Sequence, residues 1–249
     1  MTSNNQHSGL AFEYTRRVVE KAQKAVKSPI WPVDPLDRVT GSSDAEFRRR
    51  TIEGILQSYH SNYDVLAEVV QNVVDAVEDA RLAGLKAPYS IDANWIGILD
   101  TGIGMSFVEV TSAFAPNVSF KTPAKSKREK KNMYRGFKGV GLTFLAYGSD
   151  DIAIHSKTPK GEFTKARMRY GRSWAEGKRS QPAVMVEDTD PSPLDALGRG
   201  TYVRVQFSPT TRPKSLTKLA ATGPVWETIL RTKTAIGQVL LGREAVCPI

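Results

Sequence analysis

Three polar residues of one helical segment could do chemistry together. In NYDVLAEVVQNVVDAVEDARLAG, residues 62–84, Glu68, Asn72 and Asp75 are spaced i, i+4 and i+7, so a helix projects them from one face, among valines. Polar groups on a buried face need partners, and a carboxylate beside an amide can hold a hydrated Mg²⁺. The alternative is an ordinary amphipathic helix whose polar stripe faces water.

A second candidate group follows an apolar segment in WIGILDTGIGM. Asp100 ends this segment, and Gly102 and Gly104 follow within four residues. A carboxylate at the end of a buried strand can accept a hydrogen bond from an amino group such as that of adenine, and glycines let a flat ring approach the backbone closely. A strand-ending turn explains the same residues, because Asp and Gly are favoured in turns.

A third group is the glycine cluster of RGFKGVGLTF, with Gly136, Gly139 and Gly141. These glycines would place unhindered backbone N–H groups at the start of a helix that begins near Leu142, where the helix dipole favours an anion. The spacing is not that of the dinucleotide-binding fingerprint, and no Gly-Lys-Ser/Thr follows, so a Walker loop is excluded. A flexible turn before a buried helix is the alternative.

A threonine opens the fourth segment of interest, GTYVRVQF, residues 200–207. Gly200 and Thr201 stand at the entrance of an alternating pattern that predicts a strand. The hydroxyl of Thr201 could complete a polar network around a bound base. A strand that opens with Gly-Thr is common, however, and indicates no chemistry by itself.

The elements that must position these groups follow from periodicity and from turn residues. Helices are expected over 12–27, 43–59 and 62–84, from Phe107, from Leu142, and over 226–241. Strands are expected over 90–100, 151–156, 163–170, 183–186 and 201–207.

The bulk properties bound the class of protein. The chain has 249 residues with 40% apolar content, which is enough for a real core. Its single cysteine, Cys247, excludes an internal disulfide and a multi-cysteine metal site. The N-terminus is polar and no segment approaches the roughly 18 apolar residues of a membrane span, so we expect a cytoplasmic protein without a membrane partner.

The net charge of +9 is concentrated in one basic run. Between residues 121 and 138, only Glu129 opposes the cations. Such a run is a solvated loop, or it meets a polyanionic small molecule or nucleic acid. Its members are Lys121, Lys125, Lys127, Arg128, Lys130, Lys131, Arg135 and Lys138.

Taken together and in this order, the four segments resemble the motifs of the GHKL ATPases. This superfamily includes the DNA gyrase B subunit, the ninety-kilodalton heat-shock chaperone, MutL, the MORC proteins and the sensor histidine kinases. EVVQNVVDA is similar to the first family motif, DTGIGM to the second, GFKGVG to the third and GTYVRV to the fourth. The resemblance covers residues 60–210.

The resemblance implies a role for each polar residue. Glu68 would be the general base that orients the attacking water, and Asn72 would bind the Mg²⁺ that bridges the phosphates of ATP. Asp100 would hydrogen-bond the adenine amino group with help from Thr201, and Asp75 would line the site near the base.

The glycine motifs would shape the rest of the nucleotide site. Those after Asp100 would form the adenine pocket, and those before Leu142 would be the hinge and phosphate cradle of a lid over ATP, which the basic run would help to close. Lys138 is the first candidate for a phosphate contact. The further nucleotide-binding residues are Gly102, Gly104, Met105, Gly136, Lys138, Gly139, Val140 and Gly141.

The fold that the resemblance implies is an α/β two-layer sandwich, the Bergerat fold, with a mixed, mostly antiparallel sheet and helices on one face. We expect a polar tail and helical arm over 1–59, the ATP-binding core over 60–210 with its lid at 117–141, and a C-terminal helical segment over 211–249 that could start a further domain.

Within the superfamily, hydrolysis of ATP is favoured over transfer of phosphate to a histidine. Of the candidate acceptors, His7 is in the polar tail, His155 lies on an expected strand, and His60 has no recognisable dimerisation hairpin around it. The Asn-x-x-Asp-Ala pattern after Glu68 also suits the hydrolases. A protein or histidine kinase domain and a poorly hydrolysing nucleotide-binding scaffold are the alternatives.

Among the hydrolases, ATP commonly acts as a switch that closes two protomers together. We therefore expect an ATP-dependent homodimer that drives an effector domain or partner protein, with nucleic acid as a further partner of the basic run. Relatives usually take a γ-phosphate-sensing lysine from the following domain. This chain ends soon after the core, so a fragment with slow hydrolysis is expected, and Lys233 is only a weak substitute.

Overall fold

The computed structural model describes residues 42–80, 89–91, 94–115, 118, 140–182, 184–186 and 190–237. The expected helix over 12–27 lies outside these residues, as do His7 and Cys247. Of the lid and its glycines, Val118, Val140 and Gly141 are described, whereas Gly136, Lys138, Gly139 and the rest of the basic run lie outside.

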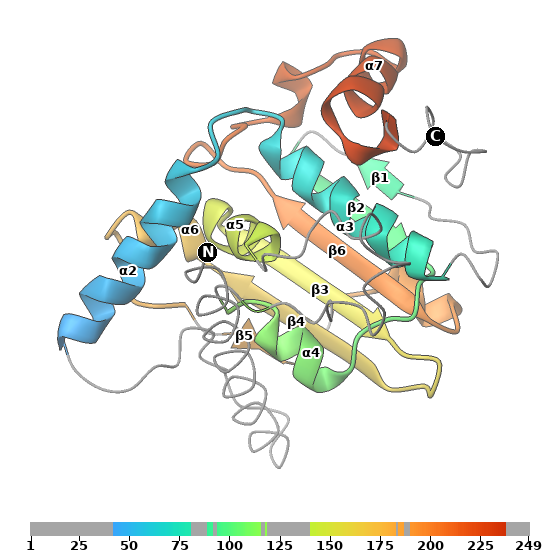
Figure 1. The fold of residues 1–249 in the computed structure, drawn as a ribbon, viewed down its shortest axis with the longest axis horizontal. Coiled ribbons are helices and arrows are strands. Elements are labelled where there is room, and N and C mark those ends of the chain that lie inside the picture. Colours follow the sequence, from blue (N-terminus) through green and yellow to red (C-terminus); the bar gives the residue numbers. More distant parts are fainter. Residues whose placement is uncertain are drawn as a thin grey trace, which may run out of the picture.

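Six described strands form one sheet in the order β1-β2-β6-β3-β4-β5 (Figure 1). Every described pairing is antiparallel, so the expectation of a mixed sheet was wrong for this part of the chain. The reason is that β2 and β3, which run in the same direction, are separated by β6 between them. The strands are Tyr89–Ile91 (β1), Trp95–Asp100 (β2), Asp151–Lys157 (β3), Phe163–Arg169 (β4), Val184–Met185 (β5) and Gly200–Gln206 (β6).

The segment 90–100 is not the single strand that its apolar content predicted. It contributes β1 and β2, which pair with each other in antiparallel register, with Tyr89 opposite Ile98. Asp92 and Asn94 lie between the two strands, and both residue types favour turns over strands. These two residues are the sequence signal for two strands in place of one.

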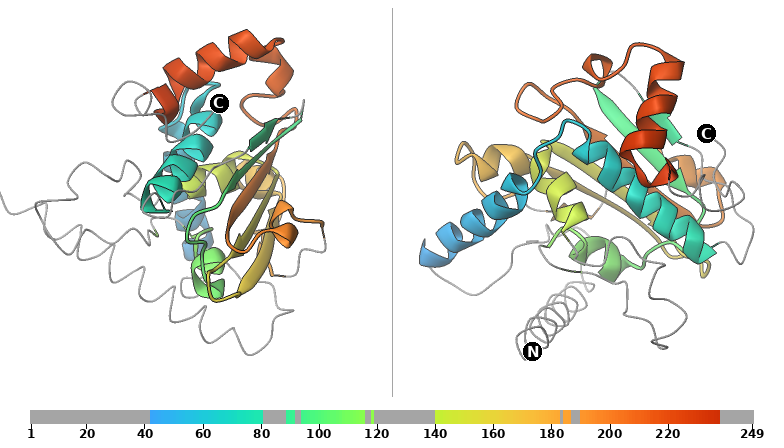
Figure 2. Two further views of the ribbon diagram at one scale, coloured as in Figure 1. Left: turned by 90° about the vertical axis from the view of Figure 1, so that its right-hand side faces the viewer. Right: turned by 45° about the horizontal axis from the view of Figure 1, so that its top comes forward.

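Helices cover one face of the sheet and give the molecule its second layer (Figures 1 and 2). Helix α3 packs on β2, and α4 and α5 pack on β3. Helix α2 packs on α5 and α6, and its Ile52 is fully buried. The helices are Ser42–Gln57 (α2), Asp64–Ala80 (α3), Phe107–Ser112 (α4), Gly141–Gly148 (α5), Gly171–Ala175 (α6) and Gly223–Lys233 (α7).

The core lies between the two layers and is built from alternate strand residues and the apolar stripe of α3. Its members from the sheet include Ile96, Ile98, Ile152, Ile154, Met168 and Val205. Four valines of α3, Val69, Val70, Val73 and Val74, are buried there too. The polar stripe of α3 therefore lies beside the core rather than on a fully solvated surface.

Local sequence signals explain how several of these elements begin. Helix α4 starts with a capping box, in which Ser106 and Glu109 satisfy each other's backbone N–H groups. The Asp64 carboxylate at the start of α3 accepts a hydrogen bond of 2.7 Å from the Ser61 N–H. No helix in the described part of the chain is long and apolar enough to cross a membrane.

The short 3₁₀ helix η2, Pro193–Ala196, lies on the sheet face opposite the helical layer (Figure 2). Charged side chains of β4 and β6 gather on this face. The Arg167 guanidinium contacts the carboxylates of Asp151 and Asp190, and Arg204 donates to Asp190 as well. The ammonium of Lys165 in β4 also lies 3.3 Å from the Asp195 carboxylate of η2, so these paired charges hold η2 and the segment before it against the sheet.

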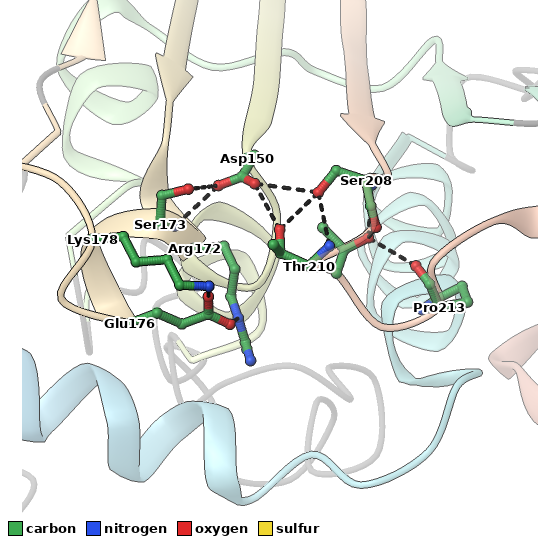
Figure 3. A network of polar contacts seen from close by, with 9 residues as sticks. Asp150, Arg172, Ser173, Glu176, Lys178, Ser208, Thr210 and Pro213 are labelled. Carbon is green, nitrogen blue, oxygen red and sulfur yellow. Dashed lines mark hydrogen bonds and ion pairs between the residues drawn. The ribbon is translucent and has the colours of Figure 1, made fainter.

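A polar network around Asp150 ties the start of β3 to α6 and to the segment after β6 (Figure 3). The Asp150 carboxylate accepts four hydrogen bonds, from the N–H and Oγ of Ser173, from Ser208 Oγ and from Thr210 Oγ1. Burial raises the pKa of Asp150, but the hydrogen bonds from Thr210, Ser173 and Ser208 outweigh it, so the net pKa is lowered. These hydrogen bonds join α6 and the segment after β6 to the start of β3, which indicates a structural role for this carboxylate.

Candidate functional site

The Asp100 carboxylate is buried where β2 ends beside the start of β6. The residue is 4% exposed, and Oδ1 accepts hydrogen bonds from the Gly102 N–H at 2.8 Å and the Thr201 N–H at 3.1 Å. No hydrogen bond from the described part of the chain reaches Oδ2. Burial raises the pKa of Asp100 to about 7, against the two backbone hydrogen bonds, which lower it. One oxygen is thus fixed, and the other can accept a further donor.

Two glycines allow the backbone to pass close to this carboxylate. A Cβ on Gly102 would lie 2.9 Å from Asp100 Oδ1 and 3.0 Å from the Ala76 carbonyl oxygen of α3. Gly200 has φ +135°, and a Cβ there would lie 2.1 Å from the Asp100 carbonyl oxygen. Side chains cannot be added at either position without moving backbone, so glycine is required for α3, β2 and β6 to meet here.

Ser156 of β3 completes this junction, although no motif marked it. Its fully buried Oγ accepts a hydrogen bond of 2.7 Å from the Met105 N–H and lies 3.0 Å from Thr201 Oγ1. It also donates to the Gly200 carbonyl oxygen. Thr201 therefore supports Asp100 through its backbone, while its hydroxyl joins Ser156. The only sequence signal was a small polar residue at a position in the same alternation as the buried Ile152 and Ile154.

Gly104 and Met105, both predicted to contact the nucleotide, are anchored to the end of β3. Gly104 has φ +67°, and a Cβ there would lie 2.1 Å from the Lys157 carbonyl oxygen. Met105 is held by its N–H bond to Ser156. The close contact with Lys157 and the positive φ therefore require glycine at position 104, whether or not a ligand binds.

Glu68 lies on α3, and its two carboxylate oxygens have different neighbours. Oε1 accepts a hydrogen bond of 2.8 Å from the Tyr59 hydroxyl. Oε2 lies against the first residue of α5, because a Cβ on Gly141 would come within 2.1 Å of it. The structure thus brings the first motif and the last glycine of the third motif together. Sequence reasoning missed Tyr59, which carries no motif signal.

Asn72 and Asp75 lie one and two turns after Glu68 on α3. Asn72 is partly exposed. Asp75 is 1% exposed, and its Oδ1 accepts a hydrogen bond of 2.9 Å from Gln71 Nε2. Asp75 precedes Ala76, the residue that packs against Gly102. The stripe of α3 therefore runs from the Asp100 junction toward Tyr59.

The donor set on α3 is compatible with a magnesium ion held mainly by substrate and water. Among the described residues, no three His, Cys, Asp or Glu side chains cluster as a metal-binding group. Mg²⁺ keeps several waters and commonly takes one or two protein oxygens together with phosphate oxygens. The amide oxygen of Asn72, one helical turn after Glu68 on α3, fits that requirement.

Two further sequence candidates lie near the ends of α5 and α7. Val140 precedes α5 as its N-cap and makes no side-chain capping hydrogen bond, while its carbonyl accepts from the Phe144 N–H. Lys233 ends α7, and its ammonium lies 5.8 Å from the centroid of the Tyr63 ring, just before α3. Both therefore belong to the end of the helical layer where Glu68 lies.

The structure brings described parts of all four motifs together. The second motif meets α3, which carries the first, at Ala76, and the described end of the third meets α3 at Glu68. The fourth motif reaches the second through the hydrogen bond from the Thr201 N–H to Asp100. A scan of protein-family models found no match to this chain, and a search of curated proteins found none either.

Proposed function

We propose that the site along α3 binds Mg-ATP and that the chain is an ATPase of the GHKL type with a Bergerat fold. The observation that carries the proposal is the Asp100 carboxylate, buried with one oxygen fixed by two backbone N–H groups. A buried carboxylate is costly unless it is hydrogen-bonded, and its second oxygen suits an amino donor such as that of adenine.

The direction of α3 supports a nucleotide that lies along the helix. Ala76 contacts the Asp100 turn, and Glu68 lies eight residues earlier, which is about 12 Å along the helix axis. With adenine at Asp100, the phosphates would extend past Asn72 toward Glu68. Asn72 would hold Mg²⁺, which when bound neutralises charge on the phosphates.

Glu68 would act as the general base in hydrolysis. A water oxygen forms the new bond to the γ-phosphorus, the bond from that phosphorus to the bridging oxygen breaks, and the water proton passes to the Glu68 carboxylate. The products are ADP and inorganic phosphate. Two features support this role: Glu68 is two helical turns away from the adenine end, and its carboxylate is held between Tyr59 and Gly141.

Nucleotide binding is tested by thermal unfolding with and without Mg²⁺ and a non-hydrolysable ATP analogue. Ligand at 100 times its Kd should add about 2.7 kcal/mol to the stability of the parent protein. Asp100→Asn should lose this gain, because its amide presents a donor where adenine needs an acceptor. Asp195→Asn, on the opposite sheet face, is the matched control and should keep it. No shift in the parent protein would overturn the proposal.

Phosphate release then distinguishes the function classes. Steady release by the parent protein supports an ATPase, whereas binding without release supports a nucleotide-binding scaffold. Label transferred from ATP to the protein would support a kinase. For the ATPase we further propose an ATP-dependent homodimer that acts on an effector, with nucleic acid at the basic run. Sedimentation with and without the analogue tests the dimer, and a nucleic-acid titration across salt concentrations tests the basic run.

A further inference from the structure

We propose that Tyr59 is a positioning residue for Glu68, an inference that rests on the proposed ATPase function. Tyr59 lies between α2 and α3, nine residues before Glu68. Its hydroxyl donates a hydrogen bond of 2.8 Å to Glu68 Oε1. Hydrogen bonds to a charged partner are stronger than neutral ones, so this contact can select one orientation of the carboxylate.

The ring of Tyr59 is itself held in place. It stacks on the ring of Phe144 in α5, with a centroid distance of 3.7 Å and an angle of 11° between the planes. Its N–H also donates to the Leu56 carbonyl at the end of α2. Phe144 is 7% exposed and belongs to the core, so the hydroxyl is presented from a rigid support.

The opposite side of the Glu68 carboxylate is bounded by Gly141, where a Cβ would lie 2.1 Å from Oε2. The carboxylate is thus held between a hydroxyl donor and a backbone that carries no side chain. A general base must keep its accepting oxygen within hydrogen-bond reach of the water, and small misplacements of such groups are costly. Tyr59 supplies a fixed donor to Oε1, and Oε2 lies on the side of Gly141.

The hydroxyl of Tyr59 keeps its proton over the whole physiological range. Burial raises the pKa of Tyr59, and the neighbouring Glu68 carboxylate raises it further. Tyr59 therefore donates to Glu68 and does not act as the base. A hydrogen bond to the ionised carboxylate also favours that form, which is the form that accepts a proton from water.

Tyr59→Phe tests this role because it keeps the stacked ring and removes only the donor. We expect kcat for ATP hydrolysis to fall roughly tenfold, the size of one hydrogen bond to a charged group, with KM for ATP unchanged. The acidic limb of the pH–rate profile should move to higher pH. Tyr63→Phe is the matched control, since it removes a hydroxyl from the same connecting segment, and it should resemble the parent protein.

A second variant tests whether the position of the Tyr59 hydroxyl, and not only its presence, determines the rate of hydrolysis. Phe144→Leu keeps the Tyr59 hydroxyl but removes the ring that supports it, so kcat should fall and the acidic limb should move in the same direction. Hydrolysis is compared at temperatures where both variants are folded. An unchanged kcat and an unchanged acidic limb in Tyr59→Phe would overturn the positioning role. A parent protein that neither binds nor hydrolyses Mg-ATP would overturn the proposed function itself, and with it this role.

Discussion

Asp100 Oδ1 accepts a hydrogen bond from the Thr201 N–H at 3.1 Å, although 101 residues separate the two in the chain. The register of β2 and β6 places them opposite each other at the end of the sheet. The same oxygen accepts from Gly102, so the second and fourth motifs share one carboxylate oxygen. This arrangement leaves Oδ2 as the oxygen with which a ligand can interact, and it makes Asp100 the most informative residue to change.

Asp100→Asn should alter the pH dependence of stability in the absence of nucleotide. The pKa of Asp100 is about 7 in the folded protein, whereas an unfolded Asp titrates near pH 3.9. The folded state therefore holds the proton more tightly, and the parent protein should lose free energy of unfolding as the pH rises from about 4 to about 7. The variant lacks this titration.

Urea unfolding of both proteins at pH 5 and pH 8 measures this difference. The free energy of unfolding of Asp100→Asn minus that of the parent protein should be more favourable to the variant at pH 8 than at pH 5. A variant that is equally destabilised at both pH values would contradict the buried, proton-binding carboxylate. This result also bears on the thermal unfolding test with the ATP analogue. If Asp100→Asn is stable at pH 8, its loss of nucleotide binding cannot be attributed to unfolding.

The affinity for adenosine should rise with pH. An adenine amino donor binds the ionised Asp100 better than the protonated form, and that group has a pKa of about 7. Adenosine is preferred to ATP here because its phosphate-free structure has no titrating group in this range. Calorimetric titrations at pH 6 and pH 8 should give tighter binding at pH 8, together with proton release near pH 7. A flat profile in the parent protein would contradict the assignment of adenine to Asp100.

Gly102→Ala should damage the site where α3 meets the turn after β2. The added Cβ would lie 2.9 Å from Asp100 Oδ1 and 3.0 Å from the Ala76 carbonyl, so backbone must move. We expect a loss of about 1–3 kcal/mol in free energy of unfolding, typical of overpacking, and weaker ATP binding. Gly54→Ala in α2 is the control: nothing lies within 4 Å of its Cβ, and it should gain about 0.5–1 kcal/mol. Equal effects of the two changes in urea unfolding would argue against a tight junction at Gly102.

The sequence predicts those parts of the site that depend on residues close together in the chain, and it does not predict those that depend on contacts between distant segments. The helix that carries Glu68 and Asn72 and the turn after Asp100 followed from periodicity and from Asp and Gly at a strand end. The sheet order did not, because the insertion of β6 between β2 and β3 depends on contacts between residues far apart in the chain. Tyr59 was missed for a similar reason, since its ring packs on Phe144, 85 residues later in the chain, where its hydroxyl reaches Glu68.

Asp150→Asn should destabilise the protein without affecting nucleotide binding. Its carboxylate accepts hydrogen bonds from Ser173, Ser208 and Thr210, at the end of β3 away from Asp100. Because the net pKa of Asp150 is lowered in the folded state, the stability that it contributes is present above about pH 4 and lost as the pH falls through its folded pKa. Since the group is partly exposed, we expect a loss of only about 1 kcal/mol at pH 7.

Urea unfolding at pH 7 and pH 3 measures this effect. The difference between Asp150→Asn and the parent protein should shrink at pH 3, below the ordinary pKa of an unfolded Asp of about 3.9, because the unfolded parent chain binds a proton there. The thermal shift with the ATP analogue should equal that of the parent protein. A loss of that shift would mean that the Asp150 network reaches the nucleotide site and is not structural alone.

Glu68→Ala and Gly141→Ala should both lower turnover while leaving adenine recognition intact. The first removes the proposed base. The second places a Cβ 2.1 Å from the present position of Glu68 Oε2, so the carboxylate must turn away. We expect Glu68→Ala to lose hydrolysis to background and Gly141→Ala to lose kcat by roughly tenfold or more, since a displaced base loses its geometry with the water. Calorimetry should show that both variants bind adenosine like the parent protein, because Asp100 lies about two helical turns away. Phosphate release that continues at the parent rate in Glu68→Ala would assign the base to another residue, and the Tyr59 contact would then serve only to hold the helices together.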